Sequence, residues 1–394
     1  MSELPTEIIQ ISLGLDDLSK IYKWKKLYLH RWYKLILSED KGNGLPCRQY
    51  QLPLRENSYS NFNMEEMHLL APSDTATKNL KATYSFDNLD NLEQAQLNEA
   101  QLQKMLESIT PENDFFGCVK NVGQGSCNCF TDFNGENYGG EFLYLALGGG
   151  FGSNKSTYRD KVDFTPTEQA IHILCHWDMD HWMSSEYYEK PLEKVRWIAP
   201  KQRNVGPTHI KKAQQLIDNG TLFFWPDKLT SKSTNFLHVY KLPDHDIKNY
   251  SGLIVAVKTS KDSDKYFFYS GDAPFSRCKT LTRSLQDKIH VIAIPHHGGK
   301  MPFRSIIKAP VEHIAICSYG KNNTYGHPYK DPVQTSRNTK ARYTKKGWKL
   351  WLETALEGDV YFYSGTNHDT WEHLILNFGP NFYPLQLSKK LMTP

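Results

Sequence analysis

The feature that most constrains this chain is a repeated pattern in which a short apolar run ends directly in histidine or aspartate. The clearest case follows the apolar residues 170–175, where the sequence reads His176-Trp177-Asp178-Met179-Asp180-His181. An apolar run of this length indicates a buried strand, and Trp182 to Glu186 can begin a helix behind it. Loops that follow strands are where α/β folds place ligands. Four side chains of metal-binding type therefore fall within six residues of one such loop.

Three further apolar runs end in the same way. They lead into these segments: Ser270-Gly271-Asp272 after residues 266–269, Pro295-His296-His297-Gly298-Gly299 after 291–294, and, after 314–318, a loop that ends in Tyr325-Gly326-His327-Pro328. Four strands that each deliver Asp or His to the following loop are hard to attribute to chance. Imidazole and carboxylate ligands suit zinc, manganese or iron.

Taken together, these motifs resemble the metallo-β-lactamase fold and, within it, hydrolases related to the nuclease domain of bacterial DNA-uptake (competence) proteins. The resemblance runs over residues 114–365 and begins with Asn121-Val122-Gly123-Gln124-Gly125, followed in order by the four segments above. It implies an α/β fold, an αββα sandwich of the metallo-β-lactamase type. We expect this hydrolase domain to span residues 114–394, after a partly helical N-terminal accessory region at residues 1–113.

The sequence departs from the family at two positions near the expected site. The family usually has an acid after Gly-Gln-Gly, where this chain has Ser126. It also usually ends the second strand in Asp, where this chain has Ala146 or Leu147. In the family that Asp supports the ligand loop, and such supporting groups are often worth about 10 to 100-fold in metal affinity or activity. Its loss predicts looser ligands and lower activity.

The number of ligands predicts two divalent metal ions. We expect the ligands to be divided as follows: His176 and Asp178 with His297 or His296 at the first ion, Asp180 and His181 with His327 at the second, and Asp272 between them. The family usually has His where Asp178 stands. A carboxylate hardens the first site, so that Mn²⁺ competes with Zn²⁺.

The resemblance implies a phosphodiesterase or nuclease, with nucleic acid as substrate. A hydroxide held between two ions about 3.5–4 Å apart would be the nucleophile. The expected catalytic residues are Asp180, His181 and Asp272, and the expected substrate-binding residues are His296, Lys321, Asn322, Asn323 and Tyr325. Two alternatives remain open. One is a metallo-hydrolase of small molecules such as cyclic nucleotides or esters, and the other is a weakly catalytic metal-binding subunit of a larger assembly.

Composition limits the partners. A net charge of +4 over 394 residues excludes a strongly basic nucleic-acid coat but leaves room for a local basic groove. Seven cysteines without a CxxC pair indicate reduced thiols and a cytoplasmic protein. The chain shows no signal peptide and no run of about 18 apolar residues, so no membrane association is expected.

The N-terminal region gives weaker signals. Residues 15–37 are loosely helical, with Trp24, Tyr28 and Trp32 beside Lys25 and Arg31. This pattern is typical of a helix that packs on the main domain, although aromatic and basic side chains together also suit nucleic acid or a protein partner. We expect a loop at 39–63 and a helix at 92–109.

Elements are also expected after the accessory region. They are strands at residues 116–120, 141–147, 195–200, 222–225 and 236–242, and a helix at 207–219. Three histidines inside or beside strands are expected to be core residues rather than ligands: His172, His290 and His313. Residues 244–246, Asp-His-Asp, are expected to form a solvated loop.

Overall fold

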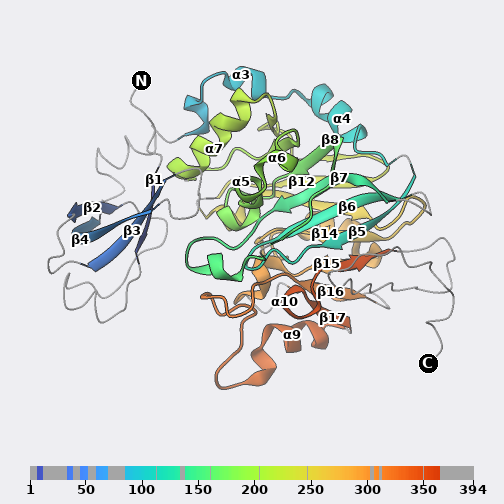
Figure 1. The fold of residues 1–394 in the computed structure, drawn as a ribbon. Helices are drawn as coiled ribbons and strands as arrows, with labels where there is room; N and C mark the ends of the chain where they lie inside the picture. Colours follow the sequence, from blue (N-terminus) through green and yellow to red (C-terminus); the bar gives the residue numbers. More distant parts are fainter. Residues whose placement is uncertain are drawn as a thin grey trace.

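The computed structural model describes residues 7–11, 33–38, 45–51 and 59–69 as backbone strands, and residues 85–363 apart from 112, 134–137, 160, 204, 246, 302–305, 310–312 and 349. Two seven-stranded sheets make up most of the described chain (Figure 1). The fold is therefore mixed α/β with two large sheets, in agreement with the coarse fold class expected from the sequence.

The first large sheet is parallel on one side and antiparallel on the other. Its strands, in spatial order, are β10 (Leu222–Phe224), β9 (Arg196–Ala199), β8 (Pro166–Ile173), β7 (Tyr138–Leu147), β6 (Cys127–Phe133), β5 (Asp114–Val119) and β18 (Val360–Phe362). The strands from β10 to β7 are parallel to one another, so β8 carries its loop to the same edge as β7 and β9.

The second large sheet has the same mixed character. Its strands, in spatial order, are β11 (Ser231–Ser233), β12 (Leu237–Leu242), β13 (Gly252–Lys258), β14 (Tyr266–Tyr269), β15 (Ile289–Ala293), β16 (Ile314–Cys317) and β17 (Leu350–Glu353). Strands β14 to β17 are parallel, so the loops after β14, β15 and β16 leave the sheet at one edge.

The two sheets share one hydrophobic core. Phe130 and Ile171 of the first sheet belong to the same buried cluster as Val255 and Phe267 of the second, and the rings of Phe130 and Phe267 lie 5.8 Å apart. Full burial of each such side chain contributes about 1.5–3 kcal/mol. This shared core fixes the two sheets against each other and thereby sets the positions of the loops at their edges.

Helices pack against the sheets in two further clusters. In one, α7 (Pro207–Asp218) packs with the first sheet, together with α6 (Glu189–Leu192). In the other, α8 (Lys279–Ser284) and α9 (Thr339–Lys345) pack with the second sheet. The short helices α5 (Ser184–Tyr187) and α10 (Thr354–Glu357) follow the ligand loop and β17. Among the described residues, every helix is too short or too polar to span a bilayer.

The strands and the helix expected at residues 116–242 are confirmed, with bounds shifted by a few residues. The helix expected at 92–109 is instead two, α3 (Leu92–Ala95) and α4 (Glu99–Glu107). The break occurs because Asn98 caps α4: its Oδ1 accepts from the Gln101 amide at 2.9 Å, while Gln101 Oε1 accepts from the Asn98 amide. Leu102 and Leu106 of α4 then enter the shared core.

The first 69 residues differ from expectation. They contribute a four-stranded antiparallel sheet with the order β1 (Glu7–Ile11), β3 (Leu45–Gln51), β4 (Tyr59–Leu69) and β2 (Tyr33–Ser38). The prediction of a loop at 39–63 is thus wrong where β3 and β4 lie, and the prediction of a helix is wrong at 33–37. Weak local periodicity is easily overridden when a strand finds hydrogen-bonding neighbours. Trp24, Lys25, Tyr28, Arg31 and Trp32 lie outside the described residues.

Candidate metal centre

The loops after β8, β14 and β15 bring histidines and aspartates together in two adjoining groups. In the first group, His176 Nε2 lies 3.2 Å from Asp178 Oδ2 and 3.6 Å from Asp272 Oδ2. In the second, His297 Nε2 lies 3.2 Å from Asp180 Oδ2. His181 Nε2 lies 3.0 Å from Asp272 Oδ1. Asp272 therefore presents one oxygen to each group, as expected of a bridging carboxylate.

The division of ligands differs in two respects from the sequence-based expectation. His297 groups with Asp180 and His181, whereas it was expected beside His176 and Asp178. His327, expected to complete the second group, belongs to neither. The sequence places both histidines in loops that follow strands but cannot tell which side of Asp272 each one reaches, because this depends on the backbone conformation of the loops.

The backbone after β15 has an unusual conformation that aims its two histidines. His296 and His297 have positive φ angles of 51° and 52°, a left-handed conformation that costs roughly 1–2 kcal/mol per residue. His297 is then fixed by its Nδ1, which donates to the Ser318 carbonyl at 3.0 Å. Because Nδ1 is used in this hydrogen bond, Nε2 faces the carboxylates and is the ring atom that a metal ion would bind.

Glycines allow neighbouring backbone to approach the ligand loop closely. The Asp180 carbonyl accepts a hydrogen bond from the Ser126 amide at 3.0 Å. A Cβ on Gly148 would lie 1.7 Å from that carbonyl oxygen, and one on Gly125 would lie 2.8 Å from it. The Gly-Gln-Gly turn and the glycine run after β7 therefore permit a close approach of backbone to the loop that carries Asp180.

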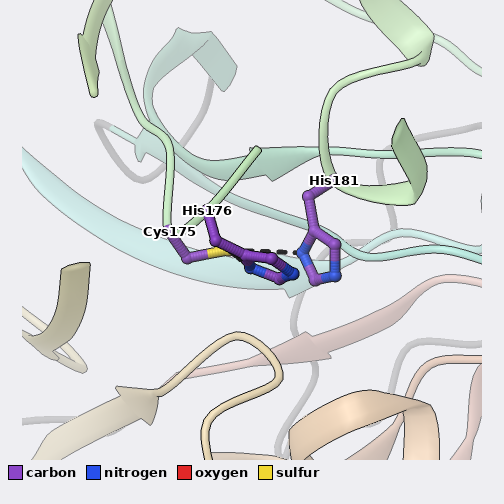
Figure 2. Close-up of side chains that lie close together, drawn as sticks. All are labelled: Cys175, His176 and His181. Carbon is purple, nitrogen blue, oxygen red and sulfur yellow. Dashed lines mark hydrogen bonds between the residues drawn. The ribbon is translucent and has the colours of Figure 1, made fainter. Parts of the chain in front are cut away.

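Cys175 and Tyr269 lie on the other side of the imidazoles, and the sequence motifs do not predict them as part of the site. Cys175 Sγ lies 3.1 Å from His176 Nδ1 and 3.3 Å from His181 Nδ1 (Figure 2). Tyr269 Oη lies 2.9 Å from His181 Nδ1. The Nδ1 atoms thus face the thiol and the phenol, while the Nε2 atoms face the carboxylates. These contacts supply the kind of support that the missing second-strand Asp was expected to give.

The charges of the site favour cation binding. Burial raises the pKa of Asp272, but His181, His296 and His176 together lower it well below the usual value for Asp. Burial likewise opposes ionisation of Asp178, but Lys248 and His176 hold its pKa well below the usual value. The Lys248 ammonium forms an ion pair with Asp178. The aspartates are therefore ionised at neutral pH.

The thiol and imidazoles are coupled in the same way. Burial raises the pKa of Cys175, yet the positive charges on His181 and His176 lower it to about 6. Burial lowers the pKa of His181, and Cys175 and Asp272 raise it to about 10 despite the opposing charge of His176. Without a metal ion, these imidazoles are therefore protonated, and metal binding would displace the protons.

The unsatisfied atoms at the centre fit metal ions. Within the described part of the chain, four buried atoms there form no hydrogen bond: His176 Nε2, His181 Nε2, His297 Nε2 and Asp272 Oδ1. Buried polar atoms normally form hydrogen bonds, so several unsatisfied atoms that face one another indicate a site for a bound ion or ligand. Neutral imidazole and ionised carboxylate are ligands of divalent first-row metals. The residues present therefore fit two divalent ions.

A cavity of about 500 Å³ opens over these groups. Its lining combines site residues with others: Gln124, Phe151, Asn154, Asp178, Met179, Asp180, His209, Asn249, Asp272, His296, Tyr325 and His327. Asn249 Nδ2 donates to Asp272 Oδ2 at 3.0 Å. Gln124 Nε2 donates to His327 Nδ1 at 3.1 Å. Gln124 and Asn249 have no local sequence signal beyond their neighbouring motifs, which is why they were not predicted.

The expected substrate-binding residues divide into two sets. His296 and Tyr325 line the cavity. Lys321 and Asn322 are exposed and are not part of the lining. Asn323 shapes the loop, since its Nδ2 donates to the His327 carbonyl at 2.7 Å and its Oδ1 accepts from the His327 amide at 3.0 Å. Asn323 therefore places His327, rather than facing the cavity.

The three histidines that the sequence predicts to be core residues are buried. His172 is buried with its ring 4.3 Å from that of Trp197, and burial lowers its pKa well below the usual value. His290 and His313 are buried with their rings 5.2 Å apart. None of the three belongs to either metal-binding group.

Comparisons with known proteins add distant structural likenesses. No protein-family model matches the sequence, and no curated protein matches it. Solved structures similar to the chain include CmlA, a diiron β-hydroxylase from Streptomyces venezuelae, at 12% identity over 90% of this chain and 75% of that one, with a TM-score of 0.35. An isothiocyanate hydrolase from Delia radicum gut bacteria aligns at 13% identity over 62% and 99%, with a TM-score of 0.33.

A third similar structure is a possible metal-dependent hydrolase from Veillonella parvula, at 9% identity over 63% of this chain and 98% of that one, with a TM-score of 0.33. Identities and TM-scores this low do not assign the chain to a family. The candidate metal centre therefore stands on its own geometry.

Proposed function

We propose that this protein is a metal-dependent hydrolase that holds two divalent ions and cleaves phosphodiester bonds in nucleic acid, on an αββα sandwich of the metallo-β-lactamase type. The observation that carries the proposal is the convergence of three buried imidazole Nε2 atoms, none of them in a hydrogen bond, on the two oxygens of the buried Asp272. Such a donor set, open to a cavity, is what a binuclear hydrolytic centre requires.

Each group of residues would hold one ion. His176 and Asp178 would bind the first, and Asp180, His181 and His297 the second, with Asp272 shared between them. Divalent ions bound there would lower the pKa of water and neutralise charge that develops on a substrate oxygen. Lys248 orients Asp178, and Asn249 orients Asp272, by direct contacts to their carboxylates.

His327 is suited to bind substrate rather than metal. Its Nδ1 accepts from Gln124, so its proton resides on Nε2. Burial, followed by the charges of His297 and His296, lowers the pKa of His327 to about 3, so the ring is neutral at physiological pH. A neutral imidazole with a fixed Nε2–H is a hydrogen-bond donor for a phosphate oxygen. His296 and Tyr325 line the same cavity and can contact the same group.

A small-molecule substrate is the second candidate. The volume of about 500 Å³ lies within the range of small-molecule sites, roughly 300–1,000 Å³. Phe151 and Met179 also give the lining an apolar part that a strand of phosphates does not need. We favour phosphodiester cleavage because the cavity offers neutral donors next to the site of two divalent ions, a combination that would suit an anionic phosphorus centre.

The proposal is tested by adding Mn²⁺ or Zn²⁺ to the purified protein with single-stranded DNA, duplex DNA, RNA, a small activated phosphodiester and a small ester. We expect turnover of at least one phosphodiester, and Asp272→Asn should reduce it by more than about 100-fold, beyond the effect of an outer-sphere partner. Asp244→Asn is the matched control, because Asp244 lies in an ion pair with Lys241 and not at the centre. Hydrolysis of the ester alone would favour the second candidate.

A further inference from the structure

A second cavity of about 400 Å³ lies apart from the metal ligands and is rich in positive charge. Its lining residues are Lys300, Met301, Tyr329, Asp331, Gln334, Ser336, Arg337, Arg342 and Lys345. Four of them are cations and one is a carboxylate. The surrounding sequence has the same bias, since the only acids of residues 300–349 are Glu312 and Asp331, among many lysines and arginines.

The one carboxylate of this lining already has hydrogen-bond donors. Asp331 Oδ2 accepts from the Tyr329 hydroxyl at 3.1 Å, and Oδ1 accepts from the Val333 and Gln334 amides at 3.0 and 2.8 Å. Asp331 therefore closes the turn that follows Tyr329. These donors partly offset the negative charge of Asp331, so the lining of the cavity keeps an excess of positive charge.

The cations are arranged around a recess rather than along a flat, solvated face. Arg342 is buried, with its Nη1 donating to the Met301 carbonyl at 2.8 Å. The Lys300 ammonium lies 5.4 Å from the centre of the Tyr329 ring. Arg337 and Lys345 are exposed and belong to the lining. A charge cluster on a helix is usually a solvated face, but a cavity whose lining includes a buried guanidinium is a concave binding surface for an anion.

Two loops, those after β15 and β16, contribute residues both to the second cavity and to the region of the metal centre. Lys300 is three residues from His297, and Tyr329 is two residues from His327. The Gly298 carbonyl joins these loops, accepting from the Tyr329 amide at 2.9 Å and from Thr339 Oγ1 at 2.7 Å. Three residues span at most about 11 Å. A polymer bound at one cavity therefore reaches the other within a few units.

We propose that the second cavity binds a backbone phosphate of a nucleic-acid strand whose scissile phosphodiester lies at the metal centre. This inference rests on the proposed function. It gives Arg337, Lys345 and Lys300 the role of contacting a phosphate that does not react, and it makes a strand of several nucleotides a better substrate than a small phosphodiester. Arg342 supplies a fixed guanidinium that suits the planar recognition of phosphate oxygens.

The test measures binding and turnover separately. The double variant Arg337→Gln, Lys345→Gln is compared with Lys340→Gln, a control on α9 whose lysine pairs with Glu353 outside the cavity. Binding of a fluorescein-labelled single-stranded DNA or RNA oligonucleotide is followed by anisotropy in EDTA, at several salt concentrations. We expect the double variant to weaken binding about 10-fold at low salt and to reduce the slope of log K against log salt by about 1.4, since each phosphate contact on a single strand contributes about 0.7.

Turnover of a small activated phosphodiester with Mn²⁺ should be unchanged in the double variant, because that substrate does not reach the second cavity. Equal oligonucleotide affinity in wild type and double variant, an equal loss in Lys340→Gln, or no binding by wild type would overturn the inference. Inorganic phosphate that competes fully with the oligonucleotide at low concentration would assign the cavity to a free anion instead. Absence of all phosphodiester turnover contradicts the proposed function, whereas the binding result decides the second cavity on its own.

Discussion

Tyr269 and Cys175 lie behind the imidazoles of His176 and His181, and together they set the orientation of those rings. The sequence predicts the imidazoles and carboxylates themselves, because each follows an apolar strand. It does not predict the groups behind them. Tyr269 is the last residue of β14, and Cys175 follows β8. Their contact depends on how the two sheets pack against each other, and a local sequence pattern cannot predict it.

Removal of the Tyr269 hydroxyl tests its role. Tyr269→Phe keeps the ring in the core but leaves His181 Nδ1 without its phenolic partner. We expect metal affinity to fall by about 10 to 100-fold, measured by competition with a chromophoric chelator, with the circular dichroism spectrum unchanged. Tyr240→Phe on β12 provides the control. Unchanged affinity in Tyr269→Phe would mean that the hydroxyl does not position His181.

Cys175 could contact a metal ion directly or support the histidines from behind. The orphaned Nε2 atoms place the ions on the side away from the thiol. We therefore expect the Co²⁺-loaded protein to lack the intense near-ultraviolet band of a cobalt thiolate. A band present in wild type and in Cys278→Ala, but lost in Cys175→Ala, would instead make Cys175 a ligand within the Cys175, His176 and His181 group.

At the scale of elements, the glycine run after β7 sets how closely two loops approach. In Gly148→Ala the new Cβ would lie 1.7 Å from the Asp180 carbonyl oxygen, so the ligand loop must move. We expect loss of metal binding, measured by equilibrium dialysis, together with a lower melting temperature. Gly220→Ala is the control: its Cβ meets nothing within 4 Å, and its positive φ costs only about 1–2 kcal/mol. Normal metal content in Gly148→Ala would show that the loop tolerates displacement.

The elements that the sequence predicts well are those with strong, uniform signals. Runs such as β14 and β16 are fully apolar, and each is bounded by a turn. The N-terminal strands have no such pattern, because β4 reads Tyr-Ser-Asn-Phe-Asn-Met-Glu-Glu-Met-His-Leu and mixes polar with apolar residues. Their order, β1-β3-β4-β2, comes from pairing between segments that are distant in sequence. Such pairing is not encoded within a window of a few residues.

At the scale of the whole molecule, the metal centre lies where edge loops of both large sheets meet. His176 to His181 follow β8 of the first sheet, while Asp272 and His297 follow β14 and β15 of the second. The sequence predicts two layers through its resemblance to a family, but it does not predict which residues form the shared core. That core, which includes Phe130 and Phe267, holds the two halves of the centre against each other.

Metal ions should therefore stabilise the whole fold. They bind groups from both sheets that only the folded chain brings together, and each ion at 1,000 times its Kd adds about 4 kcal/mol to the free energy of unfolding. We expect Mn²⁺ or Zn²⁺ to raise the melting temperature and EDTA to lower it. The Asp272→Asn variant should lose most of this metal-dependent shift, and the Asp244→Asn variant should keep all of it. A melting temperature that is independent of metal would argue against a centre shared by the two sheets.

The central claim, two ions held by the two adjoining groups, is tested most directly by anomalous X-ray scattering from crystals grown with Mn²⁺ or Zn²⁺. We predict two anomalous peaks about 3.5–4 Å apart, one among His176, Asp178 and Asp272 and one among Asp180, His181 and His297. The absence of any peak beside Asp272, or a single peak bound by Cys175 between the Nδ1 atoms of His176 and His181, would contradict it.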